Sequence, residues 1–167
     1  LAWTPDQDVV LFGTDGASKT VTIKAMAAAS GNGADVSKTW EITVNDVNRP
    51  PTIAEVTDPD AILEDAAEQT VNLAGIADGD MDTQTLTITA TSSNTDLVPD
   101  PTVTYTSPGA TGSLAYTPVP QANGTATITV TVMDNATTAN GGDDSTEITF
   151  DVVVTPVNDE PTVDAIA

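Results

Sequence analysis

Three aspartates alternate in the stretch Gly75-Ile-Ala-Asp78-Gly-Asp80-Met-Asp82, so in an extended segment their carboxylates point to the same side. Like charges gathered on one side are unfavourable unless a cation or water compensates them. Alternating aspartates with an intervening glycine also occur in calcium loops, although the glutamate that completes an EF-hand is absent here. The stretch therefore indicates a site for a hard divalent cation, with an ordinary solvated acidic loop as the alternative.

The ionisable residues narrow the possible chemistry. The chain has 25 Asp and Glu against 4 Lys and Arg, a net charge of -21, and neither Cys nor His. Sites that need sulfur or imidazole are excluded, as are disulfides and the common catalytic triads, so we expect no enzyme. The acidity disfavours nucleic acid and anionic membranes, and no apolar run is long enough to insert into a bilayer. Solubility of an exported or salt-adapted protein is the alternative reason for the acidity.

The sequence repeats itself at spacings of 107 to 113 residues, which is the size of one β-sandwich domain. The matching segments are Leu1–Pro5 with Leu114–Pro118, Val21–Met26 with Ile128–Met133, Thr39–Val44 with Thr149–Val154, and Val47–Thr52 with Val157–Thr162. We therefore expect three parts: the C-terminal portion of a preceding repeat with its linker (1–51), a complete module (52–160), and the start of the next linker (161–167).

Apolar residues and threonines alternate along much of the chain, for example over 125–132, which is typical of strands with one buried face. The pattern predicts an all-β protein, a seven-stranded antiparallel Greek-key β-sandwich. The expected strands are 52–56, 69–74, 84–91, 102–106, 113–117, 125–133 and 146–156, with at most a helical turn over 61–69. Tyr116 and Trp3 occupy the same repeat position and are expected to be core aromatics.

Together, several motifs resemble the tandem cadherin-like and immunoglobulin-like repeats of large bacterial secreted or surface proteins. They are Ile62-Leu-Glu-Asp65, the acidic stretch 75–82, Ser92-Ser-Asn94, Leu114-Ala-Tyr-Thr-Pro118, the strand ending in Asp134, and Val157-Asn-Asp-Glu-Pro161. The resemblance implies an extracellular or cell-surface rod of end-to-end modules, with calcium bound between neighbours. Neighbouring repeats in the same polypeptide would then be the main partners.

Loops gather at the two ends of such a sandwich, which predicts two metal sites. The first would combine the carboxylates of Asp46, Asp78, Asp80, Asp82 and Asp134 with the carbonyl oxygens of Asn45 and Asn48. The second would combine Glu64, Asp65, Asn158 and Asp159, completed by the next module. Ala27 stands at the position matching Asp134, Pro156 stands at the position matching Asp46, and 114–118 carries no acidic pair, so we expect one or two calcium ions at a junction.

These features predict a calcium-stiffened spacer module of an adhesin or matrix protein. The alternative is a carbohydrate-binding module, for which Tyr105 is the candidate stacking ring, with a sugar or cell-surface ligand as its partner. The fragment 1–51 would leave an apolar face in water if it stood alone. We expect its missing strands to come from outside 52–167, upstream or by strand exchange with a second chain, with Trp3 and Trp40 buried together.

Overall fold

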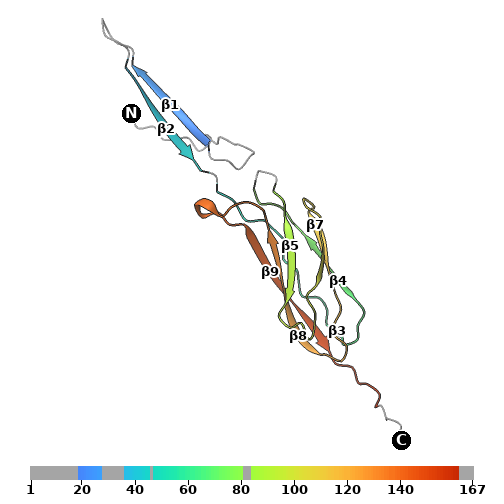
Figure 1. Ribbon diagram of the computed structural model, residues 1–167. Helices are drawn as coiled ribbons and strands as arrows, with labels where there is room; N and C mark the ends of the chain where they lie inside the picture. The colour runs from blue at the N-terminus through green and yellow to red at the C-terminus, as the bar shows by residue number, and fades with distance from the viewer. Residues whose placement is uncertain (1–18, 28–35, 46, 81–83, 162–167) are drawn as a thin grey trace.

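The computed structural model describes residues 19–27, 36–45, 47–80 and 84–161 (Figure 1). Within them the structure is almost entirely β, with one short 3-10 helix at Ala139–Gly141. The strands are β1 (Lys19–Ala27), β2 (Val36–Val44), β3 (Ile62–Leu63), β4 (Gln69–Ala74), β5 (Thr87–Ser92), β6 (Thr102–Thr104), β7 (Thr111–Tyr116), β8 (Gly124–Met133) and β9 (Ser145–Thr155). No helix in this described part of the chain is long and apolar enough to span a bilayer.

The seven strands β3 to β9 form two sheets, with strand orders β3-β9-β8-β5 and β4-β7-β6. All pairings are antiparallel except that of β3 with β9, which is parallel and only two residues long. The two long central strands, β8 and β9, are neighbours in sequence and pair along their whole length. The all-β architecture with two sheets, predicted for residues 52–160, is confirmed.

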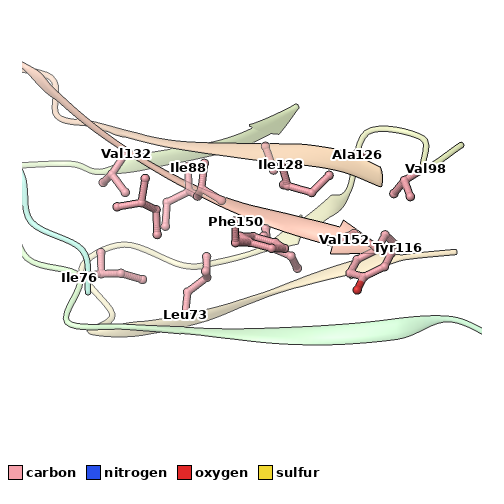
Figure 2. Close-up of a cluster of buried hydrophobic side chains, with 14 of the residues drawn as sticks. Leu73, Ile76, Ile88, Val98, Tyr116, Ala126, Ile128, Val132, Phe150 and Val152 are labelled. Carbon is pink, nitrogen blue, oxygen red and sulfur yellow. The ribbon is translucent and has the colours of Figure 1, made fainter. Parts of the chain in front are cut away.

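The core lies between the sheets (Figure 2), because apolar residues alternate with polar ones along each strand. On β8 every second residue from Ala126 to Val132 is fully buried, and on β9 the same holds from Ile148 to Val154. The facing sheet contributes Leu73, Leu114 and Tyr116. Each large side chain buried in this way contributes about 1.5–3 kcal/mol of hydrophobic free energy. The core aromatic expected at Tyr116 is confirmed, and burial raises the pKa of its hydroxyl.

The beginning of the module differs from the sequence prediction. Residues 52–56 form no strand: Thr52 makes an isolated antiparallel bridge with Ala77, and the chain then crosses toward β3. The 61–69 segment, for which the sequence predicts at most a helical turn, supplies the short strand β3. Pro50 and Pro51 directly precede residues 52–56 and have no backbone N–H. Their missing donors limit the hydrogen bonds that a strand at 52–56 could form with a neighbour.

The hairpin of β1 and β2 matches the hairpin of β8 and β9 in sequence, and the two registers can be compared. Ile23 pairs with Trp40, as Ile128 pairs with Phe150, whereas the sequence matches Trp40 with Phe150 but Ile23 with Val130. The two segment matches are therefore offset by two residues relative to each other. A shift of two keeps every side chain on its own face, so alternation alone could not reveal it.

The hairpin pairs with none of the strands β3 to β9 and lies apart from the two sheets (Figure 1). Ile42 and Val44 are 41% and 55% exposed, whereas their counterparts Val152 and Val154 are buried. That strands from outside 52–167 complete the first repeat stays a prediction. Trp3 and the side chain of Trp40 lie outside the described part of the chain, so their burial stays a prediction.

Candidate functional site

The side chain of Asn48, in the incoming linker, is buried in the end of the module. It is 7% exposed, and its Nδ2 donates to both carboxylate oxygens of Asp134 (3.1 and 3.3 Å) and to the backbone carbonyl of Asp143. The backbone N–H of Asp143 in turn donates to the Asn48 carbonyl at 3.3 Å. Asp134 directly follows β8 and is 6% exposed. Four hydrogen bonds therefore hold one linker residue, and the amide places positive hydrogens against a buried carboxylate.

Gln84 fixes the other end of the same amide. Its Nε2 donates to Oδ1 of Asn48 at 2.9 Å, so both polar atoms of the Asn48 side chain are paired. Gln84 is itself 7% exposed, and its Oε1 is buried without a hydrogen-bond partner among the described residues. A buried acceptor left unpaired costs about 1–3 kcal/mol, so this oxygen is a candidate for a ligand atom.

Asp78 and Asp80 lie on the loop that borders this region. Oδ2 of Asp80 accepts the backbone N–H of Arg49 at 3.2 Å, and Oδ2 of Asp78 lies 3.4 Å from the backbone N–H of Gln84. Asp80 therefore bonds to the residue that follows Asn48, and Asp78 lies beside Gln84, whose side chain bonds to Asn48. These contacts bring Asn48, Asp78, Asp80 and Asp134 to one end of the module.

The remaining members of the first predicted site are less informative. Asn45 is exposed, and Asp46 and Asp82 lie outside the described residues. Within the described part of the chain, no three Asp or Glu side chains converge closely enough to form a metal site on their own. The calcium role of this set stays a prediction, and it would need Gln84, backbone oxygens or the residues outside this part to complete it.

The backbone from Asn48 to Thr52, where the linker joins the module, lies close to the backbone of two loops. Thr52 and Ala77 exchange two hydrogen bonds of 2.8 and 3.2 Å. Gly79 has a φ of +77°, and a Cβ there would lie 2.1 Å from the Pro50 carbonyl oxygen. A Cβ at Gly142 would lie 3.0 Å from the backbone nitrogen of Asn48. Two glycines are thus needed for the linker to come this close.

We expect Gly79→Ala to destabilise the module more than Gly141→Ala does. Both glycines have a positive φ, which costs a residue with a Cβ about 1–2 kcal/mol. Only Gly79 adds a collision with the linker, because nothing lies within 4 Å of a Cβ at Gly141. Urea unfolding of the two variants separates the strain from the linker contact, and equal losses would contradict the docked linker.

The opposite end of the module holds the outgoing linker through Glu64. This buried side chain accepts the backbone N–H of Val157 at 2.8 Å through Oε1, and its Oε2 lies 3.5 Å from Nδ2 of Asn123. Asp65 instead faces Gln121, with contacts of 3.3 and 3.4 Å. Asn158 and Asp159 are exposed. Of the second predicted site, the structure therefore brings Glu64 to the linker backbone. Asp65 contacts Gln121 instead, and Nδ2 of Asn158 contacts the carbonyl of its neighbour Asp159.

Tyr105, the candidate for sugar stacking, is partly buried against the core. A Cβ at Gly112 would lie 3.3 Å from its Cδ2 atom. Its hydroxyl is buried and has no hydrogen-bond partner in the described part of the chain. Tyr116 belongs to the core. These positions weigh against carbohydrate stacking on the described tyrosines.

Sequence reasoning missed Gln84, the backbone of Asp143 and Gly142. Gln84 was assigned to a strand, and no motif marks it as a partner of the linker. Asp143 acts through its peptide group, which every residue possesses. The adjacent Gly141-Gly142 pair signals a turn, but not the close approach of Asn48.

Comparison with known proteins gives little further guidance. No family model matches the sequence, and no curated protein matches it. Among solved structures, the chain is similar to the crystal structure of domains 4 and 5 of the S-layer protein SbsC. The match has 17% sequence identity and a TM-score of 0.38, and it covers 86% of this chain and 81% of that one.

Proposed function

We propose that this protein is a spacer module of a large bacterial extracellular or cell-surface protein, joined rigidly to its neighbours and stiffened by calcium. The observation that carries the proposal is the buried side chain of Asn48. A linker residue with both polar side-chain atoms paired inside the following module fixes the point at which the linker enters that module. The sequence repeat supplies the tandem arrangement in which such a fixed entry point produces a rod.

Calcium is proposed because carboxylates outnumber basic side chains at this end of the module, where the linker residue Arg49 is the nearest Lys or Arg in the sequence. After Arg49 the sequence contains no Lys or Arg. The carboxylates of Asp78, Asp80 and Asp134 and the unpaired Oε1 of Gln84 are the hard oxygen donors that calcium prefers. Asn45, Asp46 and Asp82 would add further oxygens at this end, and Glu64, Asp65, Asn158 and Asp159 would serve the junction with the next module.

Thermal melting with and without calcium tests the proposal. Extracellular calcium modules bind at about 0.1–1 mM, and a ligand at one hundred times its dissociation constant stabilises the folded state by about 2.7 kcal/mol per site. We expect a higher melting temperature in calcium than in chelator, and no comparable rise in sodium chloride at matched ionic strength. An identical melting temperature would remove calcium from the proposal, whereas equal stabilisation by any salt would favour adaptation to salt.

We expect Asp80→Asn to weaken calcium binding, measured by titration calorimetry, more than Asp143→Asn does. The Asp80 carboxylate lies against the linker, so losing its charge removes a candidate ligand. The Asp143 side chain is exposed, lies 3.5 Å from the backbone N–H of Ser145, and contacts Asn48 through backbone atoms that the substitution keeps. A larger effect at Asp143 would show that the site is elsewhere.

A further inference from the structure

We infer that the side chain of Asn158 inserts into a following copy of the module in the way that the side chain of Asn48 inserts into this one. The receiving group, here called the asparagine socket, consists of Gln84, Asp134, Gly142 and Asp143. This inference rests on the proposed tandem arrangement. It identifies the partner of the outgoing linker as a second module with the same socket, and it requires no metal.

The socket selects an asparagine by its chemistry. The Asp134 carboxylate and the Asp143 carbonyl accept hydrogens from one side of the Asn48 amide, and Nε2 of Gln84 donates to its oxygen on the other. An aspartate would place its charge against Asp134, and an apolar side chain would leave these buried groups unpaired. Gly142 closes around the Asn48 backbone and leaves no room for a Cβ without displacement.

The outgoing linker presents a matching asparagine. Val157-Asn158 repeats Val47-Asn48, and a Pro-Thr pair follows at the same spacing in both copies. Glu64 fixes the backbone N–H of Val157, so the chain leaves the module at a set position with Asn158 next in line. Asn158 is exposed here, and its Nδ2 lies 3.3 Å from the carbonyl of the adjacent Asp159. Its sequence position and its exposure both suit it for a socket on the next module.

A chain of residues 1–160 followed by a second copy of residues 51–160 tests the inference, because it places Asn158 before the added module as Asn48 stands before the first. The probe is hydrogen exchange of the asparagine side-chain amides, followed by NMR in chelator. In the original chain we expect slow exchange at Asn48 and fast exchange at Asn158. In the extended chain Asn158 should slow by about tenfold or more, as buried hydrogen-bonded amides do.

Asp134→Asn in the added copy alone is the matched variant, since it keeps the shape but turns the acceptor into an amide. It should restore fast exchange at Asn158 and leave Asn48 slow. Asn158 that exchanges equally fast in both chains, or an added copy whose backbone amides show it unfolded, would overturn the inference. Because the measurement is made in chelator, an absence of calcium binding would leave this result intact and count only against the calcium proposal.

Discussion

Replacing Phe150 by alanine is expected to lower the free energy of unfolding of the module by about 3–5 kcal/mol. Phe150 lies in the middle of β9, is 2% exposed, and fills the space between the two sheets (Figure 2). Alanine removes the ring's hydrophobic contribution and leaves a cavity that the neighbouring strands close only in part. Against a typical total stability of about 5–15 kcal/mol, the loss is large.

Val153→Ala is the control for this substitution. Val153 lies on the same strand but on the opposite face, and it is 37% exposed. We therefore expect a small loss, about 1 kcal/mol or less. Urea unfolding followed by circular dichroism measures both variants. Losses of equal size would contradict the placement of the core between the two sheets.

The fold could be predicted from sequence because one signal dominates it. Apolar residues recur at every second position along β8 and β9, with threonines between them on β8, and that period of two leaves a single choice of buried face. The prediction failed where pairing does not follow from the strand's own pattern. β3 is two residues long and owes its structure to the edge of β9, and Thr52 bridges Ala77 as a single pair.

The contacts at this end of the module could not be predicted from the sequence. Acidic residues near a repeated linker indicated a metal site that includes Asn48, and that site stays a prediction. The predicted contribution of Asn48 was a carbonyl oxygen for a metal, whereas in the structure its side chain bonds to Asp134 and Gln84. Which amide faces which carboxylate depends on how three distant segments meet, and no local pattern encodes that.

Asn48→Asp is expected to destabilise the module in chelator by about 3–5 kcal/mol, the cost of an uncompensated buried charge. The variant keeps the size of the side chain but replaces the donating Nδ2 with a second acceptor. Two carboxylates would then face each other in a buried position, and the Asp143 carbonyl would lose its donor. Thermal and urea unfolding measure the loss, which should appear without any change in the core.

Asn135→Asp provides the matched control, because it adds the same charge one residue after Asp134. Asn135 is exposed, and its Oδ1 accepts the backbone N–H of Thr85 at 2.7 Å, a role that a carboxylate also fills. We expect it to change stability by no more than about 0.5 kcal/mol. Equal losses in the two variants would mean that net charge, and not the buried amide, sets the stability of this end.

Calcium then separates the two roles proposed for this region. If the carboxylates around position 48 can share a cation, millimolar calcium should restore much of the stability lost in Asn48→Asp, because the added carboxylate supplies another oxygen ligand. The same calcium should raise the free energy of unfolding of the unsubstituted chain by less, since the Asn48 amide already donates hydrogen bonds to the Asp134 carboxylate. A variant that calcium does not rescue would show that the carboxylates around position 48 do not share a calcium ion.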